Sequence, residues 1–348
     1  MTSVSLPDPR PHRVGFLRGP RPTGLATDAP SGPFFAPPLR ADGLAVDSPT
    51  GNRPILHNPV IRALILVAAL VLGLGGGSAL STLLHAPASV VMVSATVGTV
   101  VLYLLVVILI EGRRPFELAP RRWPGLLIGL GLGAALFTLS FGILLAAGAY
   151  RIAGIHTDLP WALGLLSLGL RAGVTEEIIL RAGLHRLVEQ GLGTWGATAV
   201  SAVVFGAAHL TNPDATLWGA IAIAIEAGIS FGLLYSLTRS LWVVMGLHAA
   251  WNVTQGMIFG AAVSGTGETI GLFDSVPIGP DLLTGGDFGP EASIVSVLVL
   301  VAFSAVLAYA LVRRGLVVAP LRQRWRTLGH PRRPDATPRF IGHASTRG

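Results

Sequence analysis

The chain has 348 residues, of which 51% are hydrophobic and only 12% are charged, and its mean hydropathy is +0.64. This balance is typical of a polytopic membrane protein and excludes an ordinary soluble globular domain. The net charge of +7 comes entirely from arginine, gathered in the tails and in short loops, so we expect no nucleic-acid partner. The chain has no cysteine, which excludes disulfides, thiolate metal sites and a cysteine nucleophile.

Taken in order, the chain begins with residues 1–58, which are rich in proline and arginine and predict a disordered cytoplasmic tail. Residues 59–314 follow as a transmembrane domain, and residues 315–348 form a second basic cytoplasmic tail. The domain contains apolar runs of roughly spanning length, which are Val60–Leu84, Val90–Ile110, Leu126–Tyr150, Trp161–Arg186, Trp195–His209, Leu217–Leu237, Leu241–Val263 and Ser293–Val312. We therefore expect an all-α fold, a polytopic membrane helix bundle of about eight transmembrane helices.

The arrangement of charge in the loops predicts the orientation of this bundle. If the N-terminus is inside, nearly all loop arginines fall on the cytoplasmic side, whereas the outer loop Ser264–Ala292 carries acidic residues and no basic one. The chain is thus predicted to be a multi-pass protein of the cell membrane with both termini cytoplasmic. Two sets of closely spaced glycines predict helix faces for close packing: Gly73, Gly75, Gly76 and Gly77, and Gly125, Gly129, Gly131 and Gly133.

The stretch Thr175–Arg181, with the sequence TEEIILR, places two carboxylates and a guanidinium inside an apolar run. An ionised group near the bilayer centre costs at least ~2.5 to 3.5 kcal/mol, so such groups are functional candidates. In an α-helix Glu177 and Arg181 share one face, while Glu176 is rotated by about 100°. We expect Arg181 to neutralise Glu177 as a structural latch and Glu176 to project into a cavity as a general base.

Two later runs each carry a pair of residues at the same i, i+4 spacing, Phe205 with His209 and His248 with Asn252. At 1.5 Å per residue, Glu176, His209 and His248 lie roughly 14 to 21 Å from the predicted cytoplasmic ends of their helices. Because these depths nearly coincide, we expect Glu176, His209, His248 and Asn252 to line one cavity.

The chemistry of this set lacks a side-chain nucleophile. The sequence has no H-E-x-x-H and no intramembrane aspartate pair. Water must then be the attacking group, polarised by a glutamate and a histidine, while a second histidine and an asparagine donate hydrogen bonds to a tetrahedral oxyanion.

The ordered motifs E-E-x-x-x-R, F-x-x-x-H and H-x-x-x-N resemble those of the CPBP family, which comprises CAAX-prenyl-protease-2-like and bacteriocin-processing (Abi) intramembrane proteases. The similarity covers about residues 115–263. It implies a membrane endopeptidase whose partners are the lipid bilayer and a peptide or lipidated protein substrate. It further implies Glu176 as the water-activating residue assisted by His209, His248 and Asn252 on the oxyanion side, and Glu177, Arg181 and Phe205 as supporting residues.

Two alternatives to this assignment stay open. We expect no metal or cofactor, but members of the family have been described both as glutamate proteases and as metalloproteases. Glu176, His209 and His248 could hold Zn²⁺ with a water as fourth ligand, in a zinc-dependent version of the same protease. Alternatively, the buried ionisable groups could belong to a transporter or to a non-catalytic membrane scaffold.

Three other polar residues fall within the apolar runs. Arg171 is expected to pair locally or to reach solvent along a cavity. Glu226 is expected to have a structural or cavity-lining role, with an ion pair to Arg171 and a protonated carboxyl as alternatives. His185, next to Arg186, is interpreted as part of a solvated face.

Overall fold

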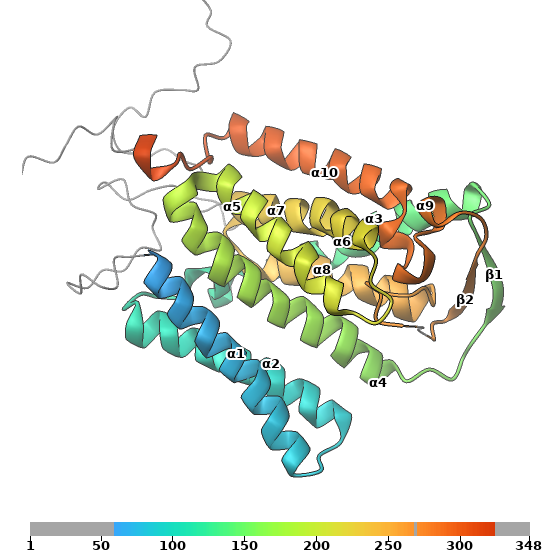
Figure 1. Cartoon of the computed structure of the whole chain (residues 1–348), viewed down its shortest axis with the longest axis horizontal. Helices are drawn as coiled ribbons and strands as arrows, with labels where there is room; N and C mark the ends of the chain where they lie inside the picture. The colour runs from blue at the N-terminus through green and yellow to red at the C-terminus, as the bar shows by residue number, and fades with distance from the viewer. Residues whose placement is uncertain (1–58, 268–269, 324–348) are drawn as a thin grey trace, which may run out of the picture.

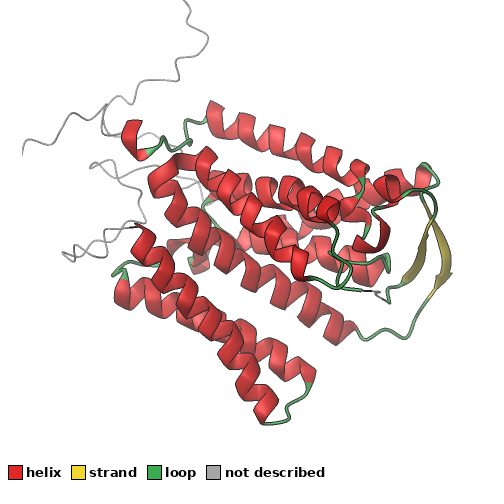
Figure 2. Ribbon diagram, in the orientation of Figure 1, coloured by secondary structure: helices red, strands yellow, loops and turns green. Residues whose placement is uncertain are grey.

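The structure is a computed structural model that describes residues 59–267 and 270–323, so the tail predicted for 1–58 and most of the tail predicted for 315–348 lie outside the described residues. It is a mostly helical bundle (Figures 1 and 2). The α-helices are α1 (Pro59–Leu83), α2 (Ala88–Leu105), α3 (Pro124–Ala146), α4 (Trp161–Gly164), α5 (Arg186–Ala208), α6 (Leu217–Ile223), α7 (Ser230–Thr238), α8 (Leu241–Val253), α9 (Asp281–Thr284) and α10 (Ile294–Arg313). Several of them continue into π-helical segments, which are Val106–Ile110, Leu165–Glu176, Ile178–His185, Ala224–Ile229 and Thr254–Ile258.

Two short strands, β1 (Tyr150–Ile155) and β2 (Phe273–Pro277), pair in antiparallel register at one end of the bundle (Figure 2). The all-α prediction missed this ribbon, and it also carried the third apolar run to Tyr150, whereas α3 ends at Ala146. The chain turns at Gly148, whose φ of 72° lies in the left-handed region that favours glycine and ends helices.

Among residues 59–267 and 270–323, five helical stretches are long and apolar enough to cross a bilayer. They are Ile61–Leu83, Ala88–Ile110, Pro120–Ala146, Leu217–Thr238 and Ile294–Arg313. The helices that carry Glu176, His209 and His248 are not among them. Residues 161–185 contain four charged side chains, which lower the hydropathy of that helix. The multi-pass architecture is therefore supported, while the number of eight spans and the orientation of the termini stay predictions.

The fourth predicted helix extends further than expected, and it breaks before the fifth within the connection predicted between Arg186 and Trp195. Helix α4 continues through two π-helical segments into α5, and the backbone leaves the helical conformation at Gly193, with φ 72° and ψ 179°. The break therefore lies at Gly193, seven residues after the predicted end of the fourth helix at Arg186. A β-carbon at Gly193 would collide with the backbone of residues 318–320, which pack against the turn.

The predicted glycine faces hold two helix pairs in close contact. On α3, a β-carbon at Gly129 or Gly133 would overlap the backbone of α8 at Val243 or Leu247, so these glycines let the two helices touch backbone to backbone. Gly73 and Gly77 play the same part between α1 and α2, whereas Gly75, Gly76 and Gly131 face open space. The contact with α3 positions α8, the helix that carries His248 and Asn252.

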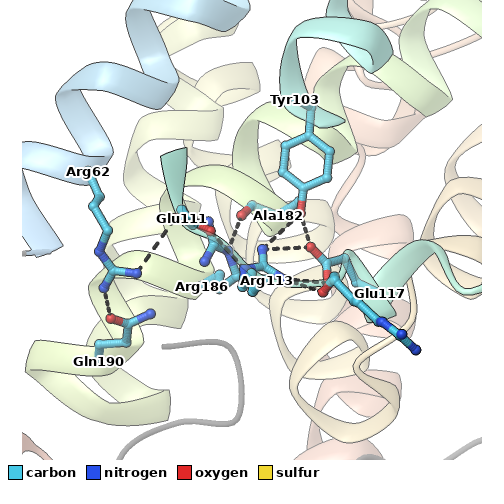
Figure 3. Close-up of polar contacts among 9 residues, drawn as sticks. Arg62, Tyr103, Glu111, Arg113, Glu117, Ala182, Arg186 and Gln190 are labelled. Atoms are coloured by element: carbon cyan, nitrogen blue, oxygen red, sulfur yellow. Dashed lines mark hydrogen bonds and ion pairs between the residues drawn. The ribbon is translucent and has the colours of Figure 1, made fainter. Parts of the chain in front are cut away.

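A network of buried ion pairs joins α1, the chain after α2 and the start of α5 (Figure 3). Glu111 accepts hydrogen bonds from Arg186 at 2.9 Å and from Arg113 at 2.7 Å, and Arg113 also binds Glu117 at 2.9 Å. Arg62 of α1 lies 3.6 Å from Glu111. The network fastens the α1–α2 hairpin to the rest of the bundle.

The network also corrects part of the sequence interpretation. Arg113 and Arg186 belong to the arginines whose predicted cytoplasmic position indicated the orientation of the bundle, and both are buried in ion pairs. His185 does not lie on a solvated face, since it is fully buried and its Nε2 lies 2.9 Å from the Ser236 hydroxyl. The local sequence around Arg186 and His185 does not reveal their buried partners, because those partners lie far away in the chain.

Candidate active site

The four predicted catalytic side chains line one cavity of about 730 Å³. Glu176 comes from the end of the π-helical segment Leu165–Glu176, His209 follows α5, and His248 and Asn252 lie one turn apart on α8. The rest of the wall is mostly apolar and includes Met92, Leu168, Ile179, Val204, Met257 and Val263. Three separate segments thus bring a carboxylate, two imidazoles and an amide into one largely apolar chamber.

Glu177 is fully buried and binds two partners with one oxygen. Its Oε1 accepts a hydrogen bond from Arg181 at 3.0 Å, as the predicted latch requires, and another from His248 Nδ1 at 2.8 Å, which the sequence did not predict. Arg181 also donates to the Ala227 carbonyl at 3.0 Å. Glu177 therefore neutralises Arg181 and orients His248 at the same time.

The neighbouring carboxylate, Glu176, is in a different environment. Its side chain is 32% exposed, and its Oε2 lies 4.0 Å from His248 Nε2. Within the described part of the chain, this oxygen has no hydrogen-bond partner. The distance is too long for a direct hydrogen bond. Because His248 donates through Nδ1, Nε2 of the neutral ring is an acceptor, and a water molecule between the two atoms can donate to both.

His209 is held by the turn of helix that precedes it. Its Nδ1 lies 2.8 Å from the Phe205 carbonyl oxygen, which can only accept, so Nδ1 carries the hydrogen and Nε2 is left for the cavity. The Phe205 ring packs edge-on against His209 at 4.6 Å between centroids and also lies 5.1 Å from the Arg181 guanidinium carbon. Phe205 thus contacts both the latch and the histidine, in keeping with the supporting role implied for it.

Some features of the site were absent from the sequence interpretation. The helix that carries both glutamates is π-helical on either side of Glu177, a rare geometry that often marks functional sites and has no simple sequence pattern. At the mouth formed by the chain after His209, Asn212 donates to the Ser264 carbonyl at 2.5 Å, and both residues line the cavity. Arg171 is exposed on the cavity wall, which agrees with the second of its two expected placements.

The alternative zinc ligands do not form a suitable group in this structure. Across residues 59–267 and 270–323, no three histidine, cysteine, aspartate or glutamate side chains lie close enough together to hold a metal ion. Glu176, His209 and His248 share a cavity without converging on one point.

Comparison with known families places this geometry in context. Residues 158–254 match the family model described as type II CAAX prenyl endopeptidase Rce1-like. The chain carries an Rce1-like domain. The Rce1-like domain begins just before α4, ends at the close of α8 and contains all four cavity residues together with Glu177, Arg181 and Phe205. No curated protein matches the chain. The resemblance inferred from three short motifs is confirmed over residues 158–254, and the family of this domain implies a protein substrate.

Proposed function

We propose that the chain is an intramembrane endopeptidase that hydrolyses a peptide bond in a membrane-associated or lipidated protein substrate. The observation that carries the proposal is the placement of Glu176. It is a partly exposed carboxylate without a partner at Oε2 among the described residues, and it faces His248 across 4.0 Å inside the cavity of an Rce1-like domain. A carboxylate in this position is suited to take a proton from water.

In the proposed reaction, one water molecule donates hydrogen bonds to Glu176 Oε2 and to His248 Nε2. Its oxygen attacks the scissile carbonyl carbon while Glu176 accepts the proton. When the carbon–nitrogen bond breaks, Glu176 returns that proton to the leaving amine. His209 presents Nε2 to the same cavity and assists Glu176 on the water. The 4.0 Å distance between His248 Nε2 and Glu176 Oε2 supports a role for His248 on the water side in this proposal, in place of the oxyanion side expected from the sequence.

The oxyanion is then assigned to Asn252. In the neutral form of each ring, His209 and His248 donate through Nδ1 to protein acceptors, so their Nε2 atoms then carry no hydrogen. The amide of Asn252 is the donor that the four-residue set retains. A single oxyanion donor contributes roughly 100- to 1,000-fold to the rate in acyl transfer, so Asn252→Ala is expected to cost that much in kcat.

The test is cleavage of a panel of membrane-anchored and prenylated peptides by the purified protein and its variants. Glu176→Gln keeps the size of the side chain and removes the base, so kcat should fall by roughly 100- to 10,000-fold. Asp274→Asn is the matched control, because Asp274 is an exposed carboxylate of β2 outside the cavity lining. Equal rates for Glu176→Gln and wild type would refute the assignment.

Metal analysis of the same preparation addresses the zinc alternative. Stoichiometric zinc that is lost together with activity on chelation, and restored with it, would replace the metal-free mechanism. Intact substrates throughout the panel, combined with proton or solute flux in vesicles, would favour the transporter instead.

A further inference from the structure

Glu226 is a second buried carboxyl next to the candidate site, and the mechanism above does not use it. It lies in the π-helical segment Ala224–Ile229 between α6 and α7, with 2% of the residue exposed. Its carboxyl makes no hydrogen bond or ion pair with any residue in the described ranges, and its Oε1 is fully enclosed. Arg171, considered above as a partner, lies instead on the exposed wall of the large cavity.

Such an environment determines the protonation state of Glu226. An isolated carboxylate buried away from water is far more costly than a neutral acid, so the group retains its proton. A neutral carboxyl without a hydrogen-bond partner still costs about 1 to 3 kcal/mol. A water molecule that hydrogen-bonds to the carboxyl would remove this cost.

A small cavity beside Glu226 has room for that partner. Its volume is about 10 Å³, at the lower limit for one water molecule. Its wall includes the polar residues Glu226, Glu291, Ser264, His248 and Asn252. A buried water is stable where two to four polar groups surround it, and this cavity supplies that number.

Glu291 reinforces this arrangement from the opposite side. It lies in the turn Pro290–Ala292 and is 3% exposed, with its Oε1 unpaired within the described ranges. Burial raises the pKa of Glu291, although Ser264, His209 and Trp251 oppose that shift. Two neighbouring buried carboxyls do not both ionise, so at least one proton stays on the pair.

Asn252 lies in the wall between the two cavities, since it lines both of them. For its Nδ2 to donate to an oxyanion in the large cavity, its Oδ1 must point away and accept a hydrogen bond from behind. The mechanism proposed above does not say which group donates this hydrogen bond to Asn252 Oδ1.

We propose that Glu226 is a positioning residue that acts through one water molecule in the small cavity shared with Glu291. The protonated carboxyl of Glu226 donates a hydrogen bond to this water, and the water donates one to Asn252 Oδ1. This second hydrogen bond holds Asn252 with Nδ2 facing the large cavity. The proposal rests on the proposed function for its effect on catalysis. The protonated carboxyl and the bound water are properties of the folded protein that do not depend on whether the protein cleaves peptides.

The kinetic test uses three substitutions of similar size. Glu226→Gln keeps a donor and is expected to retain kcat within about threefold, whereas Glu226→Leu removes the donor and should lower kcat at least about tenfold with little change in KM. Ser201→Ala is the control on α5, because Ser201 is fully buried, its hydroxyl has no hydrogen-bond partner among the described residues, and it lies outside both cavity linings. If Glu226 acts through Asn252, Glu226→Leu should add less than about twofold in an Asn252→Ala background.

An independent readout separates this proposal from proteolysis. Infrared difference spectra of wild type and Glu226→Gln at neutral pH should show the carbonyl stretch of a protonated carboxyl that is lost in the variant and shifted in Asn252→Ala. Absence of that band overturns the proposal, even if Glu226→Leu does not fold. A folded Glu226→Leu protein with wild-type kcat, or additive losses in the double variant, also overturns it. If the band is present and no peptide is cleaved, the proposed function fails and the carboxyl assignment stands.

Discussion

The bridging position of Glu177 allows stability and catalysis to be separated by mutation. Its Oε1 binds both Arg181 and His248, and all three residues are buried. Glu177→Gln removes the negative charge and leaves the Arg181 guanidinium uncompensated. Removing one partner of a buried ion pair typically costs about 3 to 5 kcal/mol.

The other contacts of Arg181 do not compensate for the lost charge of Glu177. Its remaining contacts are the Ala227 carbonyl and the faces of Phe205 and Phe231, at 5.1 and 5.2 Å from the guanidinium carbon. The carbonyl acts as a dipole and the aromatic faces act as quadrupoles, so none of them replaces a full negative charge. We therefore expect Glu177→Gln to lie toward the lower end of the range, about 3 kcal/mol, because the amide oxygen still accepts one hydrogen bond.

The assay is reversible unfolding in mixed detergent micelles, followed by far-UV circular dichroism, together with peptide cleavage. The double variant Glu177→Gln/Arg181→Met removes both charges and should recover most of the stability, since an apolar replacement of a buried pair is often neutral or stabilising. Its kcat should stay low, because His248 Nδ1 no longer faces a carboxylate. Wild-type stability of the single variant, or full activity of the double variant, would refute the reasoning.

Three further predictions follow from other contacts. Gly133→Ala should destabilise the protein by about 1 to 3 kcal/mol through overpacking of α3 against α8, while the control Gly131→Ala, which faces open space, should be neutral or up to ~1 kcal/mol stabilising in detergent unfolding. Burial alone raises the pKa of Glu111, but Arg186 and Arg113 more than offset this and hold it below its usual value of 4.5. The stabilisation from Glu111 is thus fully present above pH 4.5 and is lost as the pH falls through the lower pKa of the folded state. The unfolding temperature of wild type should therefore drop more steeply in acid than that of Glu111→Gln. Parallel curves of unfolding temperature against pH would contradict the assignment. Arg113→Met should loosen the α1–α2 hairpin, seen as faster proteolysis between α2 and α3, and an unchanged cleavage rate would show that the ion pairs do not hold it.

The sequence determined a large part of the site before any geometry was known. The spacing of Glu177 and Arg181 predicted their ion pair, and the helical depths of Glu176, His209 and His248 predicted a shared cavity, because both follow from the regular rise and rotation of a helix. The glycine pattern of α3 likewise identified the face that α8 packs against, although it could not tell that Gly131 points away.

Other features depended on residues distant in the chain. The contact of His248 with Glu177 spans 71 positions, and the ion pair of Arg186 with Glu111 spans 75, so no local pattern contains them. The buried Glu291 was interpreted as part of an acidic outer loop, and β1 was merged with the helix before it, since its partner strand lies far along the chain.

What the sequence by itself determined is the class of the protein, a membrane-embedded helical bundle, and the side chains that line the candidate site, because hydropathy and helical spacing are local properties. What only the tertiary structure decided is the environment of each of those side chains. Burial and hydrogen bonds from other helices make Glu177 a fixed support and leave Glu176 facing His248 in the cavity. They also enclose Glu226 behind Asn252, since the environment of a charge is set by whatever the fold packs around it.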